Sequence, residues 1–482
     1  MTNRTSLTIL QMNDSHAYFN LHQEMFWNGG QAVYRPVGGY ARIATIVKKI
    51  RAESQGSVLF CDCGDTLHGT YPALKTQGQA MIPVLNSLGI DAMTAHWEFA
   101  YGPAIFKQLT AKLDFPVLAI NVFDQATKKH LFSPYSVKEI GGLRIGLVGI
   151  ASNIIDKTMP PSYSEGLEFT LGREELPPII DVLRTQEKVD LIILISHLGF
   201  PQDMQLLSEV EGIDICLSGH THNRLTQPVI QGKTLVIQSG CHGSFLGRLD
   251  LELEGKRIVD YRHHLIEVEA HIDPDPTVDD LIRQALTPYQ EELSTVVGET
   301  ATALNRGAML ETTMDNFLLQ ALLESTGAQL GFSNGWRYGA PIVPGKVTLN
   351  DLYNIIPMNP PVSTVELRGE ELVLMLEENL ERTFACNPYD QMGGYAKRCM
   401  GLNLYIKVEN PKGQRIQELF VRGEQVRPDR VYTAAFVTMQ GVPAKFGTNR
   451  LNLEINAVEA MQRYLAKNSP VEAGLRGTIV VV

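Results

Sequence analysis

Short apolar runs that end in polar clusters are the feature that most limits how this chain can fold. Over the first 265 residues these runs alternate with amphipathic helical patterns. Apolar runs of this length are typical of strands buried on both faces. Strands that alternate with helices favour a layered α/β domain. The predicted strands are Leu7–Met12, Val58–Cys61, Phe115–Ile120, Ile145–Ile150, Leu191–Ile195, Ile213–Leu217 and Thr234–Ile237.

The helical patterns and a later change in composition divide the chain into a domain at 1–265, a linker at 266–300 and a domain at 301–482. In the linker, a stiff Asp-Pro turn precedes a pattern that predicts one helix from Thr277 to Val296, with Thr277 as its N-cap. Helices are predicted over Gly38–Ala52, Gln79–Leu88, Pro103–Leu113, Arg173–Thr185 and Asp315–Ser325. Further strands are predicted over Ser363–Leu367, Leu402–Val408 and Val431–Ala435.

Bulk composition describes a globular protein and narrows the range of partners. A length of 482 residues favours two domains, and 44% hydrophobic with 20% charged residues can build a sizeable core. The net charge of -11 gives no sign of a surface for a nucleic-acid polymer, which would favour a basic patch. A small anionic substrate remains compatible with this charge, because a metal ion can supply positive charge locally.

The start of the chain and its cysteines bear on compartment. Met1–Thr5 runs directly into Leu7–Leu10, without an apolar leader and small-residue cleavage site, and the chain has no apolar run of about 18 residues. The 6 cysteines form no CxxC pair, and several lie in apolar runs, as buried free thiols do. We therefore expect a cytoplasmic protein, as the chain is given, that does not associate with a membrane.

Carboxylate and imidazole side chains stand where five apolar runs give way to loops. The clusters are Asn13–His16, Asp62–Asp65, His96, Ser196–His197 and Gly219–His222. Any one of them could be an ordinary turn with a local hydrogen bond, but their recurrence at successive strand ends favours one metal site. Such ligands suit Mn, Fe or Zn. Seven such ligands are enough for two ions that share a bridging carboxylate.

These motifs resemble those of the calcineurin-like metallophosphoesterases and, more narrowly, of the two-domain 5′-nucleotidase family. The matching stretches are Asp14-x-His16, Gly64-Asp65, His96-Trp97-Glu98, Ser196-His197 and Gly219-His220-x-His222, and Gly38–Arg42 and Asn121 also fit. The resemblance implies a four-layered α/β domain, with β-sheets flanked by helices, and an α+β C-terminal domain that binds substrate.

The resemblance also implies a ligand set for two divalent metal ions, which would be Mn, Fe or Zn. Asp65 would bridge them and, with His96, would be catalytic. One ion would be held by Asp14, His16, Asp65 and His222, and the other by Asp65, His96, His197 and His220.

One stretch departs from the family pattern. The family has Gly-Asn-His-Glu-Phe-Asp where this chain has Ala95–Ala100, so His96 replaces an asparagine ligand. The family's leaving-group histidine and its partner aspartate fall at Trp97 and Ala100. The His-Trp-Glu-Phe sequence is similar to that of the sulfur-oxidation thiosulfohydrolases (SoxB), as are Gly335–Gly339 and Asn387–Gly394 in the second domain.

Substrate contacts are expected from both domains. In the second domain, the family's Asn-Gly-Gly-Gly-x-Arg is reduced to Asn334-Gly335-Trp336-Arg337, and the stacking aromatics of the nucleotidases are absent from Pro357–Pro360 and Met439–Val442. Guanidinium groups could grip an anion through paired hydrogen bonds. The residues expected to contact substrate are Trp97, His68, Asn334, Trp336, Arg337 and Arg398. For two of them a second interpretation stays open: His68 could have a purely structural role, and Arg398 could form a solvated surface pair with Lys397.

Three functions are compatible with these residues. The favoured one is hydrolysis of a phosphoester, from a nucleotide or a phosphorylated metabolite, by a metal-bridging hydroxide. The second is release of sulfate from an S-sulfonate, as in SoxB, because a thiolate leaves without protonation; only this function would require a sulfur-carrier protein as partner. The third is a binding protein that kept the fold and lost turnover.

Overall fold

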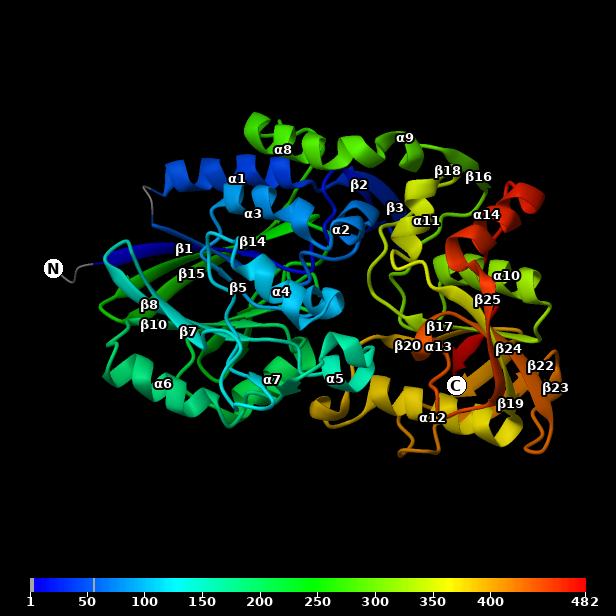
Figure 1. Ribbon diagram of the computed structural model, residues 1–482. Helices are drawn as coiled ribbons and strands as arrows, with labels where there is room; N and C mark the ends of the chain where they lie inside the picture. Colours follow the sequence, from blue (N-terminus) through cyan, green and yellow to red (C-terminus); the bar gives the residue numbers. More distant parts are fainter. Residues whose placement is uncertain (1–3, 55–56) are drawn as a thin grey trace. The chain divides into compact units, whose positions relative to one another are not determined.

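The computed structural model describes residues 4–54 and 57–482, and they form two units (Figure 1). The first unit comprises the chain up to His22 together with Pro36–Pro288. The second comprises Gln23–Arg35 and Tyr289–Val482. Each unit has its own sheets and its own buried core.

Two sheets lie face to face at the centre of the first unit. One has the strand order β15-β14-β1-β4-β5 and the other β12-β13-β11-β10-β8-β7. The first sheet is built from β1 (Arg4–Met12), β4 (Val58–Asp62), β5 (Ala92–Met93), β14 (Phe245–Glu254) and β15 (Arg257–Glu267). The second is built from β7 (Tyr135–Ile140), β8 (Leu143–Ile150), β10 (Leu191–Ser196), β11 (Ile215–Ser218), β12 (Val229–Gln231) and β13 (Thr234–Ile237).

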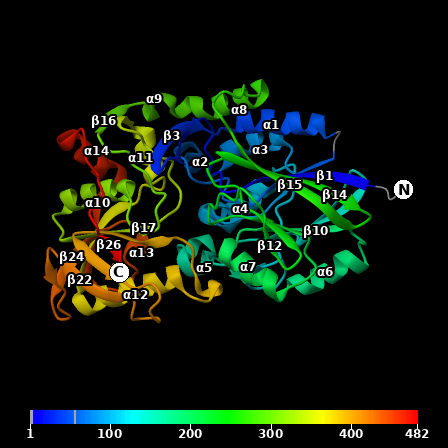
Figure 2. The ribbon, with the colours of Figure 1, turned by 180° about the vertical axis from the view of Figure 1, so that it is seen from behind.

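Helices cover the outer faces of both sheets, which completes four layers. Figures 1 and 2 show α1 (Tyr40–Glu53), α3 (Ile82–Leu88) and α8 (Pro276–Leu286) over the sheet that contains β1. On the other side, α6 (Leu176–Thr185) and α7 (Phe200–Glu209) pack on the sheet that contains β10. The four-layered α/β architecture expected from the sequence is therefore confirmed.

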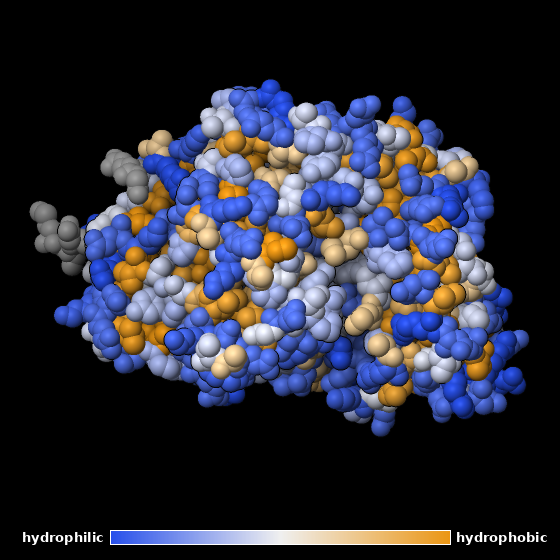
Figure 3. Space-filling view, viewed as in Figure 1, coloured by the Kyte–Doolittle hydropathy of each residue, from blue (hydrophilic) through white to orange (hydrophobic). Residues whose placement is uncertain are grey.

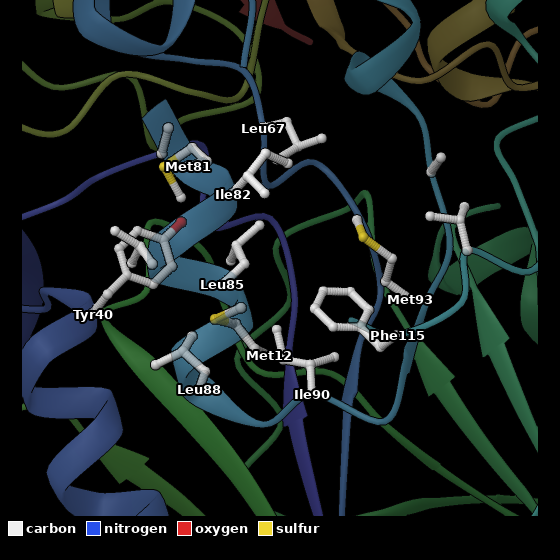
Figure 4. Close-up of a cluster of buried hydrophobic side chains, with 14 of the residues drawn as sticks. Met12, Tyr40, Leu67, Met81, Ile82, Leu85, Leu88, Ile90, Met93 and Phe115 are labelled. Carbon is white, nitrogen blue, oxygen red and sulfur yellow. The ribbon is translucent and has the colours of Figure 1, made fainter. Parts of the chain in front are cut away.

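Apolar side chains fill the spaces between the layers. Between the two sheets, Ile9 of β1 and Ile193 of β10 belong to one buried cluster. Figure 4 shows another cluster, in which Leu85 and Leu88 of α3 lie near Met12 and Met93. Met12 ends β1 and Met93 ends β5, so packing fixes the backbone just before the polar loops begin.

The parallel strands bring their carboxyl ends to one edge of each sheet. In the first sheet β1 is parallel to β4, and β4 to β5. In the second, β10 is parallel to both β8 and β11. Loops that follow neighbouring parallel strands meet at the same edge, which is where the five polar clusters of the sequence lie.

The second unit is an α+β fold, built mainly on two sheets. One sheet has the order β20-β17-β24-β19-β25 and the other β23-β22-β21-β26. Its longest helices are α10 (Thr313–Thr326), α12 (Gly369–Phe384) and α14 (Ala457–Asn468). The strands are β17 (Leu330–Gly335), β19 (Pro361–Arg368), β20 (Tyr395–Met400), β21 (Leu402–Ile406), β22 (Ile416–Val421), β23 (Glu424–Gln425), β24 (Val431–Phe436), β25 (Thr448–Asn456) and β26 (Ile479–Val481).

Shorter elements complete the two units. The hairpin of β2 (His22–Asn28) and β3 (Gln31–Val37), and the pair β16 (Val296–Thr300) and β18 (Gly345–Thr348), are two-stranded, as is the pair β6 (Val122–Asp124) and β9 (Leu167–Phe169). The short helices are α2 (Tyr71–Lys75), α4 (Pro103–Thr110), α5 (Ile155–Thr158), α9 (Gln290–Leu293), α11 (Leu349–Ile355) and α13 (Thr438–Gly441).

Two predicted elements are wrong. Phe115–Ile120 is not a strand of either sheet, and its residues make isolated bridges from Val117 and Leu118 instead. The single helix predicted from Thr277 to Val296 ends at Leu286, because Pro288 cannot continue the hydrogen-bond ladder. A 3-10 turn and α9 follow before β16. Its N-cap is Asp275, whose carboxylate accepts from the backbone N–H of Val278, and not Thr277.

Among residues 4–54 and 57–482, no helix is both long and apolar enough to cross a bilayer. On the face shown in Figure 3, small groups of apolar residues are interspersed with hydrophilic ones.

Candidate metal centre

Loops at the ends of five strands bring all seven predicted ligands into two groups. Asp14 and His16 follow β1, Asp65 follows β4 and His96 follows β5. The remaining three, His197, His220 and His222, follow β10 and β11. One group consists of Asp14, His16 and His222, and the other of Asp65, His96, His197 and His220; within each group the ligand atoms lie within 4.8 Å of one another.

In the first group, three side chains converge closely. Nε2 of His222 lies 3.2 Å from Oδ1 of Asp14, and Nε2 of His16 lies 3.3 Å from Nε2 of His222. Nδ1 of His16 faces the backbone carbonyl of His68 at 3.3 Å, so it carries the proton and leaves Nε2 with the lone pair. This arrangement is typical of histidines that bind metal through Nε2.

In the second group, Asp65 is at the centre. Nδ1 of His96 and Nε2 of His197 each lie 3.2 Å from a carboxylate oxygen of Asp65. Nδ1 of His197 donates to the backbone carbonyl of Cys63 at 2.5 Å, which fixes its tautomer. Nε2 of His16 is 3.8 Å from Oδ2 of Asp65. Asp65 therefore contacts members of both groups, which is the placement that a bridging carboxylate needs.

Most of these ligands have an uncommon backbone conformation. Asp14, His16, Asp65, His220 and His222 all have positive φ, between 48° and 70°. This region is uncommon for residues other than glycine and costs free energy, which the surrounding contacts must offset. Five of the seven candidate ligands share this strained geometry, and such strain concentrates at functional sites.

Glu98 ties two of the ligand loops together. Its buried carboxylate accepts backbone N–H bonds from Asp65, Thr66 and Leu67, at 3.3, 2.6 and 3.2 Å. It also accepts the N–H of His96 at 2.8 Å. Four N–H donors on one carboxylate hold the loop after β4 against the loop after β5, and so set the distance between Asp65 and His96.

Asp203 of α7 ties together the ends of two strands of the second sheet, β10 and β11. Its carboxylate oxygens accept from the hydroxyls of Ser196 and Ser218, each at 2.5 Å. These two serines are paired across β10 and β11, and each lies one or two residues before a candidate ligand, His197 or His220. One buried carboxylate thus fixes the ends of both strands.

The electrostatics of the site fit a bound cation. Burial disfavours the ionised form of Asp65, but His96 and His197 outweigh it and hold the pKa of Asp65 well below its usual range. Although burial opposes it, Asp65 and Asp14 raise the pKa of His197 to about 10. The buried, negatively charged carboxylates of Asp65 and Asp14 would be stabilised by a nearby divalent cation. Nε2 of His96 is buried without a hydrogen-bond partner, as expected of an atom that binds a metal.

The predicted substrate residues of the first unit border this centre. The backbone N–H of Trp97 donates to Oδ1 of Asp65 at 2.7 Å, and its indole stacks on His68 with centroids 4.9 Å apart and planes at 19°. Burial lowers the pKa of His68 to about 4, so this imidazole is neutral at pH 7. Trp97 and Ala100 are three residues apart on the 3-10 helix Trp97–Tyr101, and therefore on the same side of it.

The predicted substrate residues of the second unit have varied surroundings. Arg398 is 2% exposed, pairs with Asp315 at 3.1 Å and donates to the carbonyls of Leu310 and Ala308, so its guanidinium is held by contacts within the unit. Arg337 donates to Gly394 at 3.1 Å. Asn334 is the second-to-last residue of β17, and the rings of Trp336 and Tyr338 stack with their centroids 6.0 Å apart. Their contacts with substrate stay predictions.

Comparison with known proteins places this geometry in a family. The calcineurin-like phosphoesterase model matches residues 7–224, and the 5′-nucleotidase C-terminal domain model matches residues 295–440. The chain is therefore an ester-bond hydrolase with an N-terminal calcineurin-like phosphoesterase domain. It belongs to the two-domain 5′-nucleotidase family.

Individual relatives cover nearly the whole chain. A 5′-nucleotidase of Vibrio cholerae is 24% identical, over 97% of this chain and 91% of its own. The trifunctional nucleotide phosphoesterase YfkN of Bacillus subtilis is 25% identical over 88% of this chain, which spans 30% of that longer protein. The structure of the sulfate thiohydrolase SoxB of Thermus thermophilus is similar with a TM-score of 0.91 and 26% identity, and the match covers 99% of this chain and 96% of that one.

The pKa of Asp203 leads to a testable dependence of stability on pH. Burial raises this pKa to about 7 from 3.8, although the two serine hydroxyls favour the anion. Between about pH 4 and pH 7, the carboxyl group of Asp203 keeps its proton in the folded chain but has released it in the unfolded chain. The stability that this proton contributes is therefore complete below about pH 4 and is lost as pH rises through about 7.

Asp203→Asn cannot ionise, and its amide can still bond both serines. In excess chelator, we expect the melting temperature of the variant minus that of the wild type to be a few degrees larger at pH 8 than at pH 5. Thermal unfolding followed by circular dichroism measures it. An equal difference at both pH values would mean that Asp203 is already ionised at pH 5.

Proposed function

We propose that this protein is a two-metal hydrolase that cleaves a phosphoester bond. The observation that carries this proposal is the position of Asp65, which contacts His16 of one ligand group and His96 and His197 of the other. Mn, Fe or Zn would suit this mixture of carboxylate and imidazole ligands. A pair of bound ions supplies an activated hydroxide and neutralises the anionic substrate.

The protein's own residues have three tasks in this reaction. Asp65 and the six other ligands hold the ions at a fixed spacing, and Glu98 and Asp203 keep the ligand loops in register. The Trp97–His68 stack forms an apolar wall beside the centre. A complete and well-supported ligand set favours an enzyme over a protein that only binds.

The composition of this wall limits the leaving groups that the enzyme can expel. Neither Trp97 nor Ala100 has a transferable proton, and the lowered pKa of His68 keeps that imidazole neutral. A positioned general acid is worth roughly 10²–10⁴-fold in rate, and an alkoxide leaving group needs it most. We therefore expect phosphoesters whose leaving group is stable as an anion to be the best substrates.

A thiosulfohydrolase activity is the second candidate. A thiolate is a leaving group that needs no proton near neutral pH, so the same Trp97 wall suits an S-sulfonate. The similarity of the chain to SoxB favours this candidate as well. Its substrate would be a sulfonate on the cysteine of a carrier protein.

Direct assays separate the two candidates. We expect the metal-loaded protein to hydrolyse p-nitrophenyl phosphate and to release no sulfate from an S-sulfonated cysteine peptide, and the metal-free protein to do neither. Phosphate and sulfate release are measured on the same preparation. Sulfate release without phosphatase turnover would replace the first candidate by the second, and no turnover of either substrate would contradict both.

Restoring an acid should widen the range of leaving groups. In the double variant Trp97→His with Ala100→Asp, the two residues lie on the same side of the 3-10 helix, so the aspartate can orient the imidazole. We expect kcat/KM for an alkyl phosphate such as glycerol phosphate to rise at least about tenfold relative to that for p-nitrophenyl phosphate.

Trp97→Phe is the matched control, since it removes the indole without adding an acid. It should leave the ratio of the two kcat/KM values near that of the wild type. If the double variant binds metal as the wild type does and its ratio is also unchanged, Trp97 does not occupy the leaving-group position.

A further inference from the structure

A second pair of histidines, His22 and His242, lies beside the first ligand group and has no part in the function proposed above. The His242 ring centroid is 6.0 Å from that of His16 and 6.1 Å from that of His222. The ring of His22 is perpendicular to that of His242, at 5.8 Å. Tyr18 packs on both rings, at 4.7 Å from His22 and 4.6 Å from His242.

The backbone of His242 resembles that of the candidate ligands. Within the described part of the chain, the histidines with positive φ are His16, His220, His222 and His242, and the first three belong to the predicted ligand set. His242 is 3% exposed and has φ of 59°. Its N–H donates to the carbonyl of Asp14 at 2.7 Å, which joins this strained residue to the first ligand loop.

The position of His22 is also specified by its surroundings. A Cβ at Gly38, where φ is +89°, would lie 2.4 Å from Cε1 of His22, so glycine leaves the room that this imidazole occupies. Nδ1 of His22 lies 3.1 Å from the carbonyl of Asn20 and therefore carries the proton. Nε2 then has the lone pair and lies 3.0 Å from the hydroxyl of Ser244. A backbone carbonyl on one ring nitrogen is how metal-binding histidines are commonly oriented.

We propose that His22 and His242 bind a third divalent transition-metal ion beside the dinuclear centre. A ring nitrogen of each histidine lies within 4.8 Å of one on the other. Two Zn–N bonds of about 2.0–2.1 Å span at most about 4.2 Å, so a small ring rotation brings both nitrogens onto one ion. Imidazole suits zinc or nickel better than magnesium or calcium.

An ion at this site would add positive charge next to Asp14, His16 and His222. That charge would strengthen the attraction for an anionic substrate at the centre. The site does not require the substrate to be a phosphoester, so it can be tested separately from the proposed function.

Zinc stoichiometry tests the site. Chelator-treated protein is titrated with Zn²⁺ by calorimetry, and bound zinc is counted after gel filtration. We expect the wild type to bind three equivalents, and His22→Ala to bind two, with affinity for the third reduced at least about tenfold. The matched control is His271→Ala, whose side chain is 76% exposed and which should keep all three.

Two outcomes would overturn the third site: a wild type that saturates at two equivalents, or a His22→Ala variant that still binds three. If His22→Ala does not fold, a Co²⁺ titration of the wild type replaces it, and a third equivalent without its own visible absorption band overturns the site. Two bound equivalents with intact hydrolysis would contradict only the third metal site. Absence of both bound metal and hydrolysis would contradict the proposed function.

Discussion

The rest of the site depends on one buried carboxylate, that of Asp65. It lies within 3.2 Å of His96 and His197 and within 3.8 Å of His16, so histidines from both sheets converge on it. A buried charge of this kind is tolerable only when opposite charge is close. Much of the surrounding structure therefore serves to bring imidazoles, and the ions they would bind, to this point.

The supports of the centre are themselves buried carboxylates, used in two different ways. Glu98 accepts four backbone N–H groups and so joins loops of the first sheet. Asp203 accepts two serine hydroxyls and joins strands of the second, and its raised pKa makes that clamp sensitive to pH. Ligands on strained backbone are held to a fixed geometry by such supports, which a two-metal site requires.

Apolar runs that end in polar residues located the five clusters, which lie close together in the structure. The choice of seven candidate ligands among them came from the resemblance to the family and stays a prediction. The sequence could not reveal Asp203, which lies on a helix and acts through space on Ser196 and Ser218, or the histidine pair, which is 220 residues apart along the chain. Glu98 lies two residues after His96 in the sequence, but its role in joining two ligand loops follows only from its four backbone N–H contacts in the structure. Phe115–Ile120 has the composition of a strand, yet tertiary packing gave it isolated bridges.

Anomalous X-ray diffraction from crystals grown with Mn²⁺ tests the central claim most directly. Two peaks about 3.5–4 Å apart, one on each side of the Asp65 carboxylate, are the result that this account predicts, with or without a further peak at His22 and His242. A single peak, or two peaks that do not share Asp65, would contradict it.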